Sequence, residues 1–312
     1  MRYPTRWIPP LAALLLGALA LGAAIQAQQG KPPPKPPAGV KFEKDVTYGT
    51  AAGEELKLDL SRPEHADGPL PCVVVIHGGA WRAGNKSGHD DLTWKFAQRG
   101  YVSATVGYRF CPKFPFPAQV EDVKCAVRFL RANASKYGLD PARIGAIGFS
   151  AGAHLSMMLG VMDKDDGLEG TGGWADQSSK VSAVVSFAGP TDFTTEFPEQ
   201  SRGLVKDFIG GTLAEKPDAY KRASPATYVG AGDAAMLLFQ GTKDVLVPHT
   251  QAYKMADALA KAGVPGRVEI LVGAGHGWGG YDMERTFAAT YEFFDRQLKP
   301  APKPAAGPSP PS

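Results

Sequence analysis

The pentapeptide at residues 148–152, GFSAG, constrains this chain more than any other feature of its sequence. A short, mostly apolar run of strand length, residues 143–147, precedes it, and residues 153–159 after it have helical character. A G-x-S-x-G motif between a strand and a helix predicts a sharp turn on which the Ser150 side chain stands clear of the backbone. The chain around this motif must therefore fold as a strand, a tight turn and a helix.

Strand-like and helix-like segments alternate along the rest of the chain. Apolar runs predict strands at residues 55–60, 71–76, 101–106, 143–147, 181–187, 236–239 and 268–272. Helical patterns fall at residues 89–99, 117–137, 153–159, 250–262 and 281–298. Strands that alternate with helices of this length predict an α/β fold, with a mostly parallel central sheet of about eight strands and helices on both faces.

The N-terminal residues have the layout of a targeting segment. Arg2 and Arg6 precede an apolar stretch at residues 11–24, which is followed by small and polar residues. This layout predicts a secretory signal peptide over residues 1–27, with an uncleaved membrane anchor as the alternative. Cleavage would leave no stable membrane span, so we expect a secreted or periplasmic protein.

Proline-rich segments flank the part of the chain that is expected to fold. Residues 28–40 have the composition of a linker, and residues 299–312 that of an unpacked, disordered tail. The predicted domain spans residues 41–298, a length typical of one large α/β domain. The formal net charge of +3 comes without a long basic run, so we expect no nucleic-acid partner. The oligomeric state is left open.

The three cysteines are Cys72, Cys111 and Cys125. An odd number permits one disulfide at most, and Cys111 with Cys125 is the candidate pair if the protein is exported. Buried free thiols are the alternative.

A serine hydroxyl becomes a nucleophile only beside a general base that a carboxylate orients. His276 lies in a glycine-flanked loop just after the last predicted strand, which places it at the same sheet edge as Ser150. Asp244 lies in a tight loop after the preceding predicted strand, and Asp192 is the second candidate for the acid. We therefore expect Ser150, His276 and Asp244 to form a catalytic triad.

The segment HGGAW at residues 77–81 directly follows a predicted central strand. Consecutive glycines allow a backbone to approach a reacting carbonyl closely and to aim N–H groups at the oxyanion that develops there. An ordinary turn at a strand end is the alternative.

The order of four motifs resembles the α/β-hydrolase superfamily. These are HGGAW at 77–81, GFSAG at 148–152, GTKDVLVP at 241–248 and GAGHGW at 273–278. In particular, the chain resembles the hormone-sensitive-lipase-like esterases and the related bacterial acetyl-xylan and feruloyl esterases, over nearly all of residues 43–298. One departure is Ala80-Trp81 in place of the lipase-like HGGG, a pattern nearer the acetyl-xylan-esterase and formamidase-like branches.

The resemblance implies a role for each matching residue. Ser150 would be the nucleophile, Asp244 the acid and His276 the base, while the N–H groups of Gly79, Ala80 and Ala151 would form an oxyanion hole. It implies a serine carboxylesterase acting on short acyl esters, either as small molecules or as acetyl or feruloyl groups on plant polysaccharide, without a metal or cofactor. An amide hydrolase similar to formamidases, a peptidase of the same fold and a non-catalytic binding module are the alternatives.

Three further features bear on the substrate site. Trp81 and Trp278 lie beside the candidate catalytic loops and are expected to line the pocket. Residues 161–233 interrupt the alternation with Gly-, Asp- and Pro-rich stretches, so we expect this insertion to cover the site. Residues 163–169 are faintly similar to a calcium loop, but the glycine falls one place early, which favours a solvated loop without metal.

Overall fold

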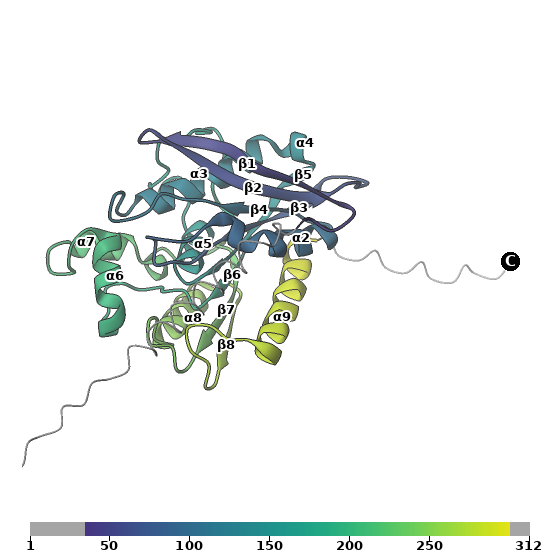
Figure 1. Cartoon of the computed structure of the whole chain (residues 1–312). Coiled ribbons are helices and arrows are strands. Elements are labelled where there is room, and N and C mark those ends of the chain that lie inside the picture. The colour runs from purple at the N-terminus through teal and green to yellow at the C-terminus, as the bar shows by residue number, and fades with distance from the viewer. Residues whose placement is uncertain (1–34, 300–312) are drawn as a thin grey trace, which may run out of the picture. The chain divides into compact units, whose positions relative to one another are not determined.

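One eight-stranded sheet organises residues 35–299, the part of the chain that this computed structural model describes (Figure 1). The strand order is β1-β2-β4-β3-β5-β6-β7-β8. The pairs β1–β2 and β2–β4 are antiparallel, and every other neighbouring pair is parallel. The predicted α/β fold with a mostly parallel sheet is confirmed.

The strands and helices follow one another in the order that the sequence predicts, and the structure contains further elements that the sequence did not predict. The strands are β1 Val40–Ala51, β2 Glu54–Pro63, β3 Leu70–Ile76, β4 Val102–Val106, β5 Leu139–Phe149, β6 Ala183–Phe187, β7 Ala235–Gly241 and β8 Gly266–Leu271. The helices are α2 Asp90–Gln98, α3 Ala118–Ala132, α4 Ala134–Tyr137, α5 Ala151–Val161, α6 Glu199–Ile209, α7 Pro217–Arg222, α8 Thr250–Ala262 and α9 Gly280–Leu298. Two 3-10 helices, Lys86–His89 and Pro225–Thr227, complete the described part.

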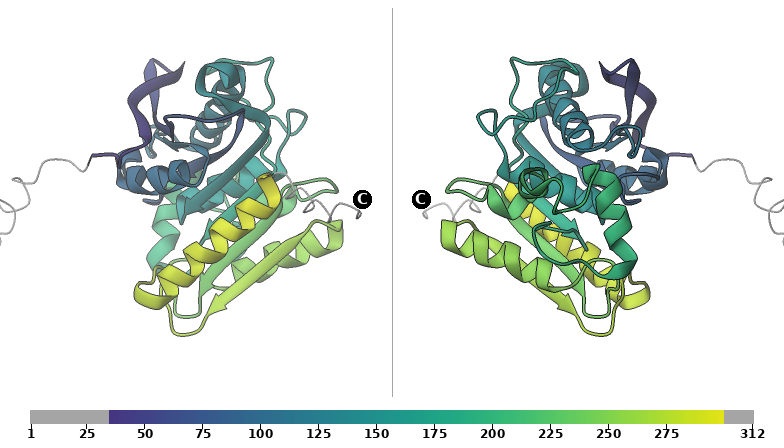
Figure 2. Two further views of the ribbon diagram at one scale, coloured as in Figure 1. Left: turned by 90° about the vertical axis from the view of Figure 1, so that its right-hand side faces the viewer. Right: turned by 90° about the vertical axis from the view of Figure 1, so that its left-hand side faces the viewer.

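The central strands are buried on both faces, which explains their continuous apolar sequences. In β3, Val73 and Val75 face the cluster that contains residues of α2 and α9, whereas Val74 and Ile76 face the cluster formed with α3, α5 and α8. In the left view of Figure 2, α9 (yellow) lies in front of the strands, and in the right view it lies behind them. The helices thus cover both faces of the sheet, as the alternation predicts.

Two elements at the N-terminal side differ from the expectation. β1 was not predicted as a strand from the sequence. Its pairing with β2 shifts register between Glu43 and Val46 and again between Thr47 and Gly49. These irregularities break the alternation of buried and exposed residues. The helix expected over residues 117–137 is divided into α3 and α4, and Gly138 ends α4 in the left-handed conformation.

The insertion predicted at residues 161–233 is not one unit in the structure. Its middle forms β6, a strand inside the sheet. The part before β6 packs beside β1. The backbone N–H of Thr50 donates to the Gly172 carbonyl, and the indole N–H of Trp174 donates to the Tyr48 carbonyl. Only the part after β6, which includes α6, reaches the candidate site described below.

The disulfide considered for Cys111 and Cys125 is absent, and all three cysteines are buried free thiols. The Cys111 thiol lies 3.9 Å from the Ala80 carbonyl, whereas the Cys125 thiol lies 3.8 Å from the Tyr48 carbonyl. The second interpretation of the cysteines is therefore the correct one.

Several predictions for the ends of the chain fall outside the described residues. These are the signal peptide at 1–27, the linker up to residue 34 and the tail from residue 300. Between residues 35 and 299, no helix is both long enough and apolar enough to cross a membrane.

Candidate active site

Ser150 occupies a strained turn between β5 and α5. Its φ of 54° lies in the left-handed region, which non-glycine residues adopt at a cost. The flanking glycines permit the turn. A Cβ atom at Gly148 would lie 2.1 Å from the Gly152 carbonyl oxygen, and one at Gly152 would lie 2.1 Å from the Ile76 carbonyl oxygen. The G-x-S-x-G motif thus has glycine at two places where a neighbouring backbone segment leaves no room for a Cβ atom.

Three loops bring the predicted triad together at one edge of the sheet. The His276 Nε2 atom lies 2.8 Å from the Ser150 Oγ atom, and the His276 Nδ1 atom lies 2.7 Å from the Asp244 Oδ2 atom. These residues follow β8, β5 and β7 respectively. The imidazole can therefore take the serine proton on one nitrogen while its other N–H donates to the carboxylate.

The Asp244 carboxylate is held by more groups than His276 alone. Its Oδ1 atom accepts hydrogen bonds of 2.9 Å from the backbone N–H groups of Leu246 and Val247. The Gln240 side chain donates to the Oδ2 atom at 2.9 Å and also to the Val247 carbonyl. Gln240 is a positioning residue that the sequence did not reveal, since a glutamine inside an apolar strand carries no motif.

The Asp244 side chain is fully buried, and burial by itself raises its pKa. The hydrogen bond from His276 and those from the backbone N–H groups of Val247 and Leu246 lower the pKa by more, so it lies below its ordinary value. The carboxylate is consequently ionised at neutral pH and able to stabilise an imidazolium at His276.

The loop after β3 has the conformation of a backbone donor site. Gly79, Ala80 and Trp81 have φ angles of 110°, 51° and 58°, and the N–H groups of Arg82 and Ala83 close a turn on the Gly79 carbonyl. The Gly78 carbonyl lies 2.7 Å from the His77 Nδ1 atom and 3.4 Å from the Tyr108 hydroxyl. Since the next peptide bond is trans, the Gly79 N–H points away from these two groups.

A cavity of about 280 Å³ opens at Ser150 and His276. Gly79 and Ala80 border it, and its other lining residues are Trp81, Pro190, Phe197, Ser201, Leu204, Val205, Leu246 and Val247. A larger cavity of about 790 Å³ lies beside His77 and Tyr108, but none of the triad residues lines it. The smaller cavity is therefore the candidate substrate site.

The two tryptophans predicted to line the pocket have different surroundings. Trp81 does line the cavity, while its indole N–H donates to the His154 Nδ1 atom at 3.1 Å. Trp278 does not line it. Its ring stacks on Phe187, and its N–H donates to the Thr286 hydroxyl at 3.1 Å, so this residue packs the loop against α9.

His154 and the second candidate for the acid, Asp192, are engaged elsewhere. His154 is fully buried and its Nε2 atom lies 2.8 Å from the Ala223 carbonyl. Asp192 accepts from the Thr194 hydroxyl and pairs with Lys254 at 3.1 Å. Between residues 35 and 299, no group of three or more His, Cys, Asp or Glu side chains could hold a metal ion.

Comparison with known proteins places this geometry in a family. The BD-FAE family matches residues 58–259. The esterase LipC of Mycobacterium tuberculosis is 32% identical over 250 residues, covering 77% of this chain and 61% of LipC. The chain spans 51–61% of the length of the curated relatives LipM, LipQ and LipC.

Solved structures agree with this placement over the whole domain. A truncated carbohydrate esterase from gut microbiota has a TM-score of 0.76 at 27% identity, covering 86% of this chain and 100% of that one. Esterase Est2 of the planctomycete Thermogutta terrifontis has a TM-score of 0.72 at 28% identity, covering 89% and 99%. The chain therefore belongs to the BD-FAE family, a family of esterases with the α/β-hydrolase fold.

Proposed function

We propose that this protein is a serine carboxylesterase that cleaves short-chain carboxylic esters through an acyl-enzyme. The observation that carries the proposal is the chain of two hydrogen bonds from Ser150 to His276 and from His276 to Asp244, of 2.8 and 2.7 Å. Family membership supports the same chemistry, since the relatives that the chain matches are named esterases.

In the acylation step, the Ser150 oxygen attacks the ester carbonyl carbon while His276 accepts the serine proton. The negative charge that develops on the carbonyl oxygen is stabilised by the N–H groups of Gly79, Ala80 and Ala151. Loss of one such donor typically costs about 2.7–4 kcal/mol of transition-state stabilisation. His276 then donates its proton to the alcohol oxygen as the C–O bond breaks.

In the deacylation step, water takes the place of the alcohol. His276 accepts a proton from the water as it attacks the acyl carbon, and then returns a proton to the Ser150 oxygen. The ionised Asp244 stabilises the imidazolium in both steps, and Gln240 holds that carboxylate in place. His276 thus accepts and donates the proton that moves in each step.

The cavity favours a small apolar acyl group. Its side chains beyond the triad are hydrocarbon, except for Ser201, whose hydroxyl donates to the Leu246 carbonyl at 2.8 Å, and Trp81, whose indole N–H donates to His154. We propose acetyl or feruloyl esters of plant polysaccharide as the natural substrates of an exported enzyme. The similarity to a carbohydrate esterase supports polysaccharide esters as substrates. Est2, which has been solved with propionate and with butyrate bound, supports a short acyl group.

Ester hydrolysis by matched serine variants tests the proposal. Ser150→Ala should lower kcat/KM for p-nitrophenyl acetate by about 10⁵-fold or more, because the nucleophile is lost. Ser156→Ala is the control, since the Ser156 hydroxyl is buried within α5 and donates to the Gly152 carbonyl, and it should retain the activity. Equal loss in both variants, or none in Ser150→Ala, contradicts the mechanism.

The same assays test the substrate class. The wild-type protein should release acetate from acetylated xylan, and Ser150→Ala should not. Hydrolysis of p-nitrophenyl acetate without release of acetate from the polysaccharide would leave a carboxylesterase and remove acetylated polysaccharide from the proposal.

A further inference from the structure

The cavity at Ser150 shares a wall with a second, similar cavity. The second cavity measures about 310 Å³ and borders α6 on its other side. Its apolar lining includes Phe193, Leu213 and Tyr220, and it contains none of the triad residues. Phe197 and Val205 line both cavities, so these two side chains stand between them.

The shared wall is closed and well packed. Phe197 is 6% exposed and Val205 is 4% exposed, although each borders two cavities. The Phe197 ring stacks on Phe193, with ring centroids 5.5 Å apart and planes 14° apart. A group that enters from Ser150 therefore meets these side chains after a short distance.

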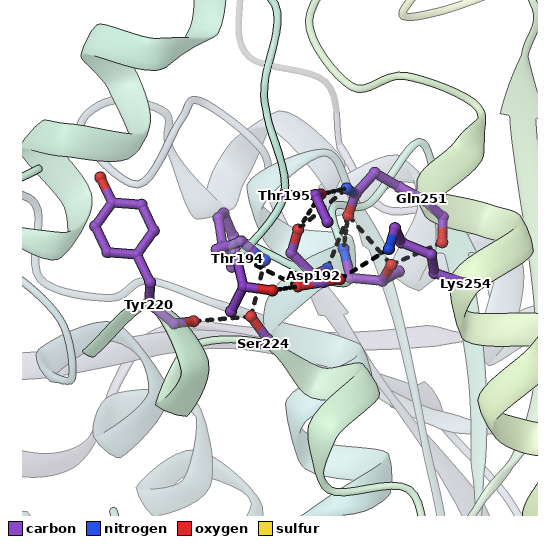
Figure 3. A network of polar contacts seen from close by, with 9 residues as sticks. Asp192, Thr194, Thr195, Tyr220, Ser224, Gln251 and Lys254 are labelled. Atoms are coloured by element: carbon purple, nitrogen blue, oxygen red, sulfur yellow. Dashed lines mark hydrogen bonds and ion pairs between the residues drawn. The ribbon is translucent and has the colours of Figure 1, made fainter. Parts of the chain in front are cut away.

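The backbone around Asp192, which precedes the wall in the chain, is held by polar contacts with Gln251 and Ser224 (Figure 3). The Gln251 side-chain oxygen accepts from the backbone N–H groups of Thr191 and Asp192 at 2.7 and 2.8 Å. The Phe193 N–H donates to the Ser224 hydroxyl at 2.8 Å, and that hydroxyl donates in turn to the Tyr220 carbonyl. These contacts hold residues 191–193, and with them the Phe193 ring on which Phe197 stacks, against α7 and α8.

The second cavity suits the distal part of a hydrocarbon chain. Its base is aromatic and aliphatic, whereas Glu196 and Arg202 form an ion pair of 2.8 Å at its edge. The side chains of this pair are 85% and 58% exposed, so the edge is in contact with water. Lys206 also lines this cavity and is exposed, so an alkyl chain could be buried along the base while the charged groups stay in water.

We propose that Phe197 and Val205 determine the acyl-chain length that this protein accepts, by separating the catalytic cavity from the second cavity. This proposal rests on the esterase activity proposed above. With both side chains present, the catalytic cavity accommodates short acyl groups. A smaller side chain at either position joins the two cavities and admits a longer acyl chain.

Acyl-chain profiles of wall variants test the proposal. Wild type, Phe197→Ala and Val205→Ala are assayed with p-nitrophenyl acetate, butyrate and octanoate, and the octanoate-to-acetate ratio of kcat/KM is compared. The ratio should rise by about tenfold or more in Phe197→Ala, since two newly buried methylene groups are worth roughly that factor. A smaller rise is expected for Val205→Ala, which removes less volume.

Two controls separate opening of the wall from general loosening. Phe114 lines the larger cavity away from the triad, so Phe114→Ala should keep the wild-type ratio. In the double variant Phe197→Ala/Leu213→Trp, the indole fills the second cavity and should reverse the gain. Leu213 is 38% exposed, which leaves room for the larger side chain.

The possible results decide the proposal in either direction. An unchanged ratio in folded Phe197→Ala, or a gain that persists in the double variant, overturns it. If Phe197→Ala does not fold, Phe197→Leu and Val205→Ala decide in its place, and an unchanged ratio in both overturns the proposal. The esterase activity itself is tested independently by comparing hydrolysis of p-nitrophenyl acetate by wild type and by Ser150→Ala. It is present if wild type hydrolyses this ester and Ser150→Ala does not.

Discussion

His154 and His276 have opposite environments, although both lie near Ser150 in the fold. His276 is partly exposed and bridges Ser150 and Asp244. His154 is enclosed by the rings of Trp81, Phe193 and Phe208. Burial lowers the pKa of His154 to about 4, against the smaller opposing effect of its hydrogen bond to the Ala223 carbonyl. It is therefore neutral at pH 7, with its Nδ1 atom accepting from Trp81 and its Nε2 atom donating.

This buried imidazole should make stability depend on pH. In the unfolded chain it titrates near 6.5, so between about pH 6.5 and pH 4 the unfolded state binds a proton that the folded state does not. The free energy of unfolding should thus fall as the pH falls, by about 2 kcal/mol from pH 7 to pH 5 for this group alone. His154→Gln should lose that part of the pH dependence in urea denaturation.

The exposed residue His65 supplies the control for this measurement. His65→Gln should keep the pH dependence of the wild-type protein. If the free energy of unfolding falls by the same amount between pH 7 and pH 5 in His154→Gln and in the wild-type protein, the inference that His154 is neutral in the folded state is wrong.

Single residues were predictable from the sequence where a motif surrounds them. Ser150, Asp244 and His276 are each flanked by residues that impose a turn after a strand, and the structure brings their side chains together. Gln240 was missed, because its role depends on the Asp244 carboxylate lying beside it. Trp278 was wrongly expected to line the pocket, since proximity in sequence to His276 does not decide which side of the loop its ring occupies.

At the scale of elements, the regular strand–helix units were predictable and the irregular ones were not. α6 was missed because Pro198 precedes it, a helix-disfavouring glycine, Gly203, lies within it, and only a few of its positions are buried. Its importance arises from tertiary packing, which places Val205 against both cavities. A short amphipathic pattern within a proline- and glycine-rich stretch is a weak signal without that context.

The stability of the segment around Asp192, which precedes α6, should depend on the side chain of Gln251. Gln251→Ala removes the acceptor of the Thr191 and Asp192 N–H groups, and each buried donor left without a partner costs about 1–3 kcal/mol. We expect a loss of about 2–4 kcal/mol in the free energy of unfolding, measured by urea denaturation.

Gln200→Ala is the matched control, because Gln200 is exposed on α6. Its unfolding free energy should stay within about 0.5 kcal/mol of the wild-type value. A Gln251→Ala variant as stable as this control would show that the contacts at Asp192 do not hold the segment in place.

At the scale of the whole domain, the order of strands in the sheet assembles the site. β5, β6, β7 and β8 are parallel neighbours, so the loops that follow β5, β7 and β8 emerge at the same edge. The parallel sheet and this shared edge were predictable from the alternation of elements. The sequence predicted that residues 161–233 cover the site, but not that only the part after β6 does so, because the residues that separate the two cavities meet only through packing of α6 on the loop after β6.

Covalent labelling by a fluorophosphonate, followed by peptide mapping, tests most directly whether these loops create a reactive serine. We predict one adduct per native chain, on Ser150, absent from Ser150→Ala and from urea-unfolded protein but present in Ser156→Ala. The adduct should disappear in urea because residues far apart in sequence must converge to activate the hydroxyl. An adduct on a different serine, or ester hydrolysis by native protein that the probe leaves unlabelled, would contradict the proposed site.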